Sequence, residues 1–113
     1  MDITTQFSDK EQLAVVTLTG SLDVSGAAEI DSELKKVVNK GFDIAIDLSN
    51  VSFISSQGTR VLVITSKAVI AREKVMYLIG PRAPVQKALI IMGVDKIIRI
   101  FSSMQELCTH RAK

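Results

Sequence analysis

Short apolar, β-branched segments alternate with amphipathic helical segments along most of this chain, and that alternation favours an α/β fold. Five segments are predicted to be strands: residues 2–7, 13–19, 44–48, 74–79 and 97–101. Four helices are predicted: residues 25–40, residues 56–72, one beginning near Pro84 and one beginning near Ser103. The short turn between the first two strands predicts an antiparallel hairpin, and the later strands, each followed by a helix, should be parallel neighbours. We therefore expect a small α/β sandwich with one mixed β-sheet, forming a single domain over residues 1–113.

The helical segments carry start, stop and core signals of their own. Ser25 or Gly26 is expected to cap the first helix. Its core-facing residues are predicted to be Ala27, Ile30, Leu34, Val37 and Val38. In the third helix the corresponding residues are Val85, Ala88, Leu89 and Met92, with Gly93 closing the helix. Ser103 and Glu106 have the spacing of a capping box, which predicts the start of the last helix.

The composition excludes several classes of protein. Hydrophobic residues make up 47% of the 113 residues and charged residues 23%, a normal mixture for a globular domain. The net charge of +2 comes from interspersed charges, and with one Tyr and no Trp the chain offers no platform for nucleic acid. Its apolar runs reach about five residues, whereas a membrane span needs about 20. The N-terminus lacks the features of a signal peptide. We therefore expect a cytoplasmic protein with no direct binding to nucleic acid and no membrane insertion.

The sequence contains few residues suited to catalysis or to metal binding. The single histidine, His110, lies near the C-terminus and is expected to be solvated. The single cysteine, Cys108, is expected to be buried filler and not a nucleophile, because no basic neighbour obviously activates its thiol. Two such ligands do not make a zinc site, and no glycine-rich phosphate-binding motif is present. The sequence predicts neither an enzyme nor a cofactor nor a metal ion.

The most informative segment runs from Asp47 to Leu62. A strand is predicted to end near Leu48, and a polar turn and a short apolar stretch then lead to a pair of serines. Ser55 or Ser56 should lie at the N-cap or in the first turn of the helix that follows. Either serine can serve as an ordinary helix cap, because its oxygen can accept a hydrogen bond from a free backbone N–H.

This second helix has two stripes of residues. The stripe expected to face the core contains Gly58, Val61, Leu62, Thr65, Ala68, Val69 and Arg72. Ser56 begins an outer stripe that continues through Arg60, Val63, Lys67 and Ile70. A helix that is apolar on nearly all sides is either covered or offers a contact surface, and the outer stripe mixes cations with apolar residues, as a binding face does.

Phosphorylation at Ser56 would change this face while leaving the fold intact. The phosphate adds a charge of about −1.5 to −2, which the free N–H groups at a helix N-terminus accommodate. A partner packed on the outer stripe would have to bury that charge, and each ~1.4 kcal/mol lost weakens binding tenfold.

Two motifs resemble those of the STAS domain family of bacterial anti-sigma factor antagonists, and the likeness covers nearly the whole chain. The stretch from Leu18 to Asp23 is similar to the family's strand-to-loop signature before the first helix. The stretch from Ile46 to Gly58 is similar to its best-known motif, a strand ending in Asp-Leu-Ser followed by an aromatic, an aliphatic, Asp-Ser-Ser or Asp-Ser-Thr, and Gly. Two positions depart from that pattern, because Ser55 stands in place of the Asp and Gln57 in place of the second Ser or Thr.

The resemblance implies partner switching. An unphosphorylated antagonist binds an anti-sigma factor that is also a serine kinase and so releases the sigma factor. The kinase then phosphorylates the antagonist, and a serine phosphatase reverses the reaction. By position the phosphorylated residue is Ser56, with Ser55 as second choice. The residues implied to bind the partner are Asp23, Ser55, Ser56, Gln57, Gly58, Thr59, Arg60, Val63 and Lys67. Asp23 could equally be a turn or cap residue. The expected oligomeric state is a monomer or a weak dimer.

Single STAS-like domains also serve in membrane transport assemblies. The alternative function is therefore a STAS subunit of a transport ATPase assembly, which binds through the same helix face without phosphorylation.

Overall fold

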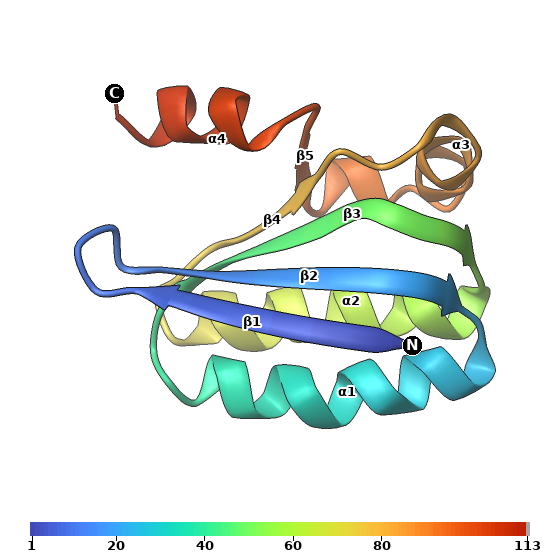
Figure 1. The fold of residues 1–113 in the computed structure, drawn as a ribbon, viewed down its shortest axis with the longest axis horizontal. Coiled ribbons are helices and arrows are strands. Elements are labelled where there is room, and N and C mark those ends of the chain that lie inside the picture. The colour runs from blue at the N-terminus through green and yellow to red at the C-terminus, as the bar shows by residue number, and fades with distance from the viewer. Residues whose placement is uncertain (113) are drawn as a thin grey trace.

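Five strands form one mixed β-sheet in the order β1-β2-β3-β4-β5 (Figure 1). The structure is a computed structural model, and it describes residues 1–112. The strands are β1 (Asp2–Ser8), β2 (Leu13–Leu22), β3 (Asp43–Ile54), β4 (Met76–Ile79) and β5 (Arg99–Phe101). The helices are α1 (Val24–Val38), α2 (Ser56–Ala71), α3 (Ala83–Ile91), the short 3₁₀-helix η1 (Val94–Lys96) and α4 (Met104–Arg111). Strands β1 and β2 are antiparallel and the other neighbours are parallel, so the predicted α/β sandwich with a mixed sheet is confirmed.

The two faces of the sheet are covered unequally. Helices α1 and α2 lie side by side on one face, and α4 lies on the other (Figure 1). Side chains alternate between the faces along each strand, so Ile44 and Ile46 enter the main core while Ala45 enters a smaller cluster on the opposite side. That smaller cluster consists of Leu13, Ala45, Tyr77, Ile79, Phe101 and Leu107. Burial on both faces explains why the β3 sequence alternates so little between apolar and polar residues.

Strand β3 is longer than predicted. It continues past Leu48 to Ile54, because the second half of β2 keeps pairing with it, as Thr19 with Asn50. The polar residues that suggested a turn form hydrogen bonds with each other within the strand. The Asp47 carboxylate accepts hydrogen bonds from the N–H and the hydroxyl of Ser49, at 2.9 and 2.6 Å. The pairing register shifts at two points, which marks bulges or irregularities in this region.

Helix caps are partly as predicted. Helix α1 is capped by Asp23, and neither Ser25 nor Gly26 is the cap, because the strand ends at Leu22 and the helix begins immediately afterwards. Gly93 adopts the left-handed conformation expected of a helix stop (φ 74°), and the Ser103 hydroxyl accepts a hydrogen bond from the N–H of Glu106 at 3.1 Å, as the capping box predicts.

Several burial predictions were wrong. Ala68 and Arg72 do not face the core but line an open groove between α1 and α2. Met92 is exposed at the end of α3, and Cys108 is exposed on α4, whose only buried residue is Leu107. The predicted core faces of the first and third helices otherwise hold, with Ala27, Ile30, Leu34, Val37, Val85 and Leu89 buried.

His110 is not a freely solvated tail residue either. Its ring is half-buried beside Tyr77 and Phe101, with centroid distances of 6.3 and 5.2 Å. These contacts belong to the attachment of α4 to the sheet.

Within residues 1–112, no helix is both long enough and apolar enough to cross a membrane.

Candidate functional site

Two helices begin side by side at the carboxyl ends of neighbouring parallel strands. Leu22 at the end of β2 pairs with Ile54 at the end of β3, so the starts of α1 and α2 lie next to each other. Both helices begin in the same way. Asp23 caps α1 through the N–H of Gly26 at 2.8 Å, and Ser55 caps α2 through the N–H of Gly58 at 3.0 Å. The two motifs recognised in the sequence therefore meet at one end of the molecule.

Ser55 holds this junction together. Its hydroxyl donates a hydrogen bond to the carbonyl oxygen of Leu22 at 3.0 Å, and its backbone N–H donates to the same oxygen at 2.9 Å. Its own carbonyl accepts a hydrogen bond from the hydroxyl of Thr59 at 3.0 Å. The Ser55 side chain is half-buried, and its hydroxyl both donates and accepts a hydrogen bond. Ser55, and not Ser56, is therefore the N-cap of α2.

Gly58 is required where α2 passes the end of β2. A Cβ atom at this position would lie 2.6 Å from Leu22 Cγ and 2.9 Å from the Leu22 carbonyl oxygen, closer than packed atoms approach. The predicted close approach of this glycine to the sheet is therefore confirmed. Gly58 and Thr59 are both buried, so these two predicted partner-binding residues offer almost no surface and instead support the site from within.

Ser56 has a different environment from Ser55. It is the first residue of α2 and is exposed, and its hydroxyl donates only to the side-chain oxygen of Gln57 at 3.2 Å. Gln57 and Arg60 are exposed beside it. Since the first turn of α2 carries no acidic residue, the positive end of the helix is uncompensated there.

The outer stripe of α2 extends from Ser56 along the helix. Arg60, Lys67 and Ile70 are exposed as predicted, whereas Val63 is half-buried and packs partly against the main core. The stripe is therefore a cationic surface with apolar residues among the charges.

Two exposed apolar residues at the same end of the sheet as Ser56 were not predicted from the sequence. Phe53 is 54% exposed near the end of β3, and Val24 is 63% exposed at the start of α1. Phe53 faces solvent because the β2–β3 register shifts between Gly20 and Ser21, so that β3 has an extra residue at this point. A bulge of this kind leaves no clear pattern in a single sequence. Val24 is the first residue of α1 because Asp23, and neither Ser25 nor Gly26, is the cap.

The arrangement offers an exposed surface that a partner could contact. Among residues 1–112 no group of three His, Cys, Asp or Glu side chains could hold a metal ion. Five open surface hollows are lined by other residues and not by Ser56. The site offers an exposed hydroxyl at a helix start, exposed apolar side chains at the same end of the molecule and cations along the helix.

Comparisons with known proteins agree with this geometry. A family model described as the STAS domain matches residues 4–107. The anti-sigma-F factor antagonist RsfB of Mycobacterium tuberculosis is 31% identical over 109 residues, covering 95% of this chain and 88% of the relative. An anti-sigma-B factor antagonist of Staphylococcus aureus is 26% identical over 101 residues, covering 88% of this chain and 94% of the relative.

The fold is also found among solved structures. The crystal structure of a putative anti-sigma factor antagonist from Thermotoga maritima superposes with a TM-score of 0.90 at 20% identity, and it covers 98% of this chain and 95% of its own. At that identity the likeness concerns the fold.

Proposed function

This chain belongs to the STAS domain family, and on that basis we propose that it is an anti-sigma factor antagonist that works by partner switching. Its unphosphorylated form binds an anti-sigma factor that is also a serine kinase, and this binding releases the sigma factor. The kinase transfers the γ-phosphoryl group of ATP to a serine hydroxyl of this chain, with release of ADP and a proton, and binding ends. A serine phosphatase hydrolyses the phosphoserine to serine and inorganic phosphate. The protein is thus a cytoplasmic regulator and a substrate of enzymes.

The single observation that carries the choice of acceptor is the contrast between the two neighbouring serines. The Ser55 hydroxyl is half-buried and makes two hydrogen bonds, to the carbonyl of Leu22 and from the N–H of Gly58. Its reaction with ATP would remove the hydroxyl proton that the Leu22 carbonyl accepts and would place an anion beside that carbonyl oxygen in a half-buried junction. The Ser56 hydroxyl is exposed and makes no contact that the fold needs. Ser56 is therefore the proposed phosphorylation site.

Phosphorylation at Ser56 switches the surface and spares the fold. The added charge of about −1.5 to −2 lies at the N-terminus of α2, where free backbone N–H groups favour an anion. Arg60 follows one helical turn later and offers a cation on the same side of the helix. The phosphate therefore finds partners on its own chain, whereas a docked protein would have to bury its remaining charge.

The proposed docking surface surrounds Ser56. From the sequence-predicted set it keeps the exposed residues Asp23, Gln57, Arg60 and Lys67, with Val63 at its margin. To these we add Phe53 and Val24, whose exposed apolar side chains are suited to fill pockets on the partner. Because a dianion between such residues would be desolvated on docking, phosphorylation is expected to weaken binding at least tenfold.

The test is incubation of the purified chain with ATP and its cognate anti-sigma kinase, followed by mass spectrometry of the intact protein and its peptides. We expect one phosphate, on Ser56. Ser56→Ala should abolish it, whereas Ser55→Ala should retain it. Ser25→Ala is the matched control, since Ser25 is an exposed serine in the first turn of the neighbouring helix. Phosphate on Ser55, or none on any serine, would overturn the proposed switch.

The alternative function, as a subunit of a transport ATPase assembly, is not favoured, because the curated relatives reported above are antagonists of anti-sigma factors. It would be supported by a stable complex with a transport ATPase subunit that forms equally well with wild type and Ser56→Asp.

A further inference from the structure

Strand β1 is an open edge of the sheet. Within residues 1–112 it pairs only with β2, and its outer side has no neighbouring strand. Edge strands are usually protected by Pro, Lys, bulges or a short length, but the seven residues of β1 contain neither Pro nor Lys, and their pairing with β2 is regular. Phe7 remains 45% exposed on this strand even though its ring packs against Phe42, with centroids 5.4 Å apart.

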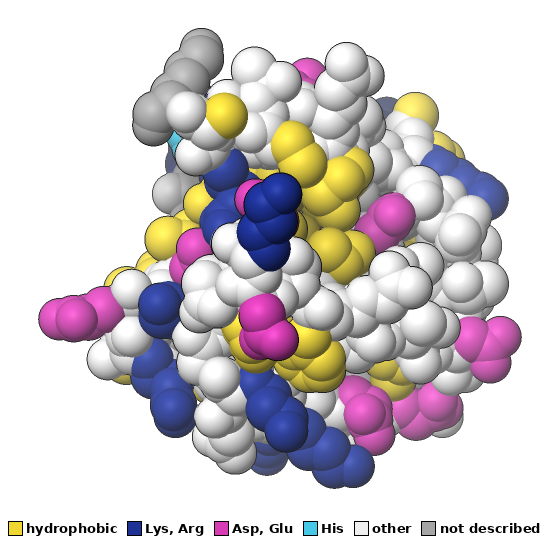
Figure 2. All heavy atoms as spheres, turned by 60° about the vertical axis from the view of Figure 1, so that its left-hand side comes forward, with side chains coloured by type: hydrophobic (Ala, Val, Ile, Leu, Met, Phe, Trp, Pro, Cys, Tyr) yellow, Lys and Arg dark blue, Asp and Glu magenta, His cyan; other side chains and the backbone are white. Residues whose placement is uncertain are grey.

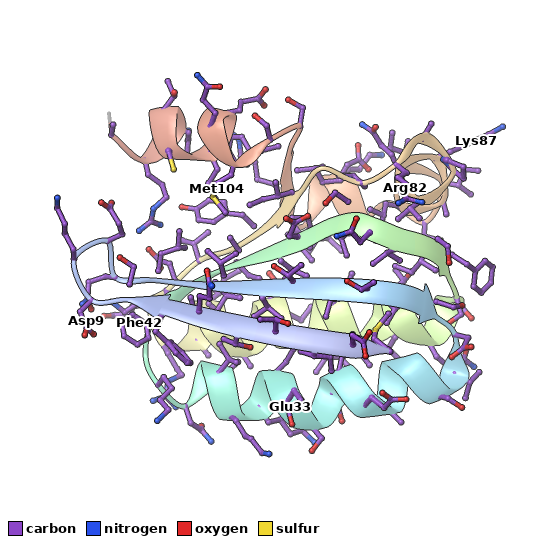
Figure 3. The ribbon with its side chains drawn as sticks, in the orientation of Figure 1. Asp9, Glu33, Phe42, Arg82, Lys87 and Met104 are labelled. Atoms are coloured by element: carbon purple, nitrogen blue, oxygen red, sulfur yellow. The ribbon has the colours of Figure 1, made fainter. Side chains whose placement is uncertain are left out.

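Helix α1 lies directly beside this edge. The N-terminal ammonium group of Met1 forms an ion pair with Glu29 at 3.3 Å, and Ile3 shares a shallow hollow with Ser32 and Glu33. Figure 3 shows Glu33 on α1 below β1. A strand added to the edge of β1 would therefore bring its own supporting elements against this flank of α1.

The flank of α1 beside β1 is charged in a definite order. Glu29, Glu33 and Lys36 follow one side of the helix at spacings of four and three residues, and Lys40 continues the stripe in the turn after the helix. The stripe is acidic in its first half and basic in its second half. On the face drawn in Figure 2, Lys and Arg side chains gather at the left and centre of the lower edge, with Asp and Glu to the right. The other charged pair of α1, Asp31 with Lys35, lies on the opposite side of the helix, at the groove with α2.

We propose that two copies of this chain form a twofold dimer through their β1 edges. The β1 strands pair antiparallel and join the two sheets into one, and the two α1 helices then lie antiparallel on the same face. The stripe is complementary to itself in this arrangement. Glu29 faces Lys40 of the partner subunit, and Glu33 faces Lys36 of the partner subunit. Because Glu33 and Lys36 already pair within each chain at 3.3 Å, the contact becomes a network of four charges.

The helix and the strand place the twofold axis at the same point. The charge stripe is symmetric about the midpoint between Leu34 and Lys35. Ile3 shares one hollow with Glu29, Ser32 and Glu33. One further strand residue advances about 3.3 Å, or roughly two helical residues, so Thr4 lies close to that midpoint. Antiparallel pairing centred on Thr4 sets Met1 opposite Phe7 of the partner subunit, so that the exposed ring becomes covered.

Charge reversal tests the helix contact. Sedimentation velocity over a range of concentrations should show a dimer for wild type. The acidic variant Lys36→Glu/Lys40→Glu and the basic variant Glu29→Lys/Glu33→Lys should each raise the dissociation constant at least tenfold. An equimolar mixture of the two variants should recover the dimer, because each supplies the charge that the other lacks. Lys35→Glu, on the far side of α1, is the control and should leave the dissociation constant unchanged.

Cross-linking tests the register of the strands. In a Cys108→Ser background, Thr4→Cys should form a disulfide-linked dimer on mild oxidation, because Thr4 faces its own copy across the axis at a Cα separation of about 4.5–5.5 Å. Gln6→Cys lies on the same open side of β1 but faces Asp2 of the partner subunit, so it should stay reduced.

A wild-type protein that is monomeric throughout, a dimer that survives both charge reversals, or equal cross-linking at the two positions would overturn the proposal. It rests on β1 and α1 alone, so its failure leaves the proposed function of Ser56 untouched.

Discussion

The hydroxyl of Ser55 donates a hydrogen bond to the carbonyl oxygen of Leu22 across 3.0 Å, and this bond ties the start of α2 to the end of β2. The same oxygen of Ser55 accepts the N–H of Gly58. One side chain thereby fixes the junction of two strands and a helix, and it leaves the next hydroxyl, that of Ser56, free at the surface. Because Ser55 is a structural cap and Ser56 is exposed, substitutions of the two serines should differ in their effect on stability.

Ser55→Ala should destabilise the protein, whereas Ser56→Ala should not. The first change removes an N-cap, which costs about 0.5–2 kcal/mol, and leaves the Leu22 carbonyl with one donor fewer. The second removes an exposed hydroxyl and should alter the free energy of unfolding by less than about 0.5 kcal/mol. Urea denaturation of both variants measures the difference. Equal losses would contradict the assignment of Ser55 as the structural serine.

Gly58→Ala should cost about 1–3 kcal/mol, because its Cβ would overlap the side chain and carbonyl of Leu22. The clash with the side chain can be isolated by a double-mutant cycle with Leu22→Ala. In that background the added methyl group meets only the carbonyl, so Gly58→Ala should cost less than it does in wild type. Additive losses in denaturation experiments would show that the close approach between Gly58 and the Leu22 side chain is not the source of the effect.

Sequence patterns predicted this fold well where a local pattern decides the structure. The hairpin, the apolar stripe of α1, the stop at Gly93 and the cap at Ser103 all follow from a few neighbouring residues. The serine pair at the start of α2 was found for the same reason. The sequence also left open which serine is the cap, and that question is decided by Leu22, which is 33 residues away in the chain.

The features that were predicted wrongly or not at all depend on contacts between residues that are far apart in the sequence. The exposure of Phe53 results from a bulge in the pairing of β2 with β3, and the length of β3 depends on its continued pairing with β2. Cys108 lies in a helix of eight residues that buries a single side chain, so its apolar periodicity is too short to indicate which face meets the sheet. In each case tertiary pairing decided what the local pattern left undetermined.

Ser56→Asp should leave the protein at least as stable as wild type. A negative charge in the first turn of α2 interacts favourably with the helix dipole, by about 0.3–1 kcal/mol at low salt. Ser56→Lys is the matched control of opposite sign and should lower the melting temperature. Both shifts should shrink as salt is added, because the site is exposed. A large loss of stability in Ser56→Asp would mean that phosphorylation at this position disrupts the fold and does not merely change its surface.

Arg111 should stabilise the packing of α4 against the sheet. Its guanidinium donates hydrogen bonds to the carboxylate of Asp43 and to the carbonyl of Glu11, both at 2.8 Å, and lies over the ring of Tyr77. Arg111→Gln should therefore speed amide hydrogen exchange throughout α4 and cost about 1 kcal/mol, since the pair is partly exposed. Arg99→Gln is the control: Arg99 is an exposed arginine over the ring of Phe101. Its loss should leave exchange in α4 nearly unchanged.

The effect of Arg111→Gln should be the same at pH 6 and pH 9. Burial disfavours the charged form of Arg111, but its contacts with Asp43 and Tyr77 outweigh burial, so its pKa is raised above the ordinary arginine value. A group whose pKa is raised in the folded state contributes its full stability below the unfolded pKa and loses it only as the pH rises through the folded one. For Arg111 that window lies far above neutral pH. If the cost of the substitution fell markedly between pH 6 and pH 9, a group other than the guanidinium would be holding α4 in place.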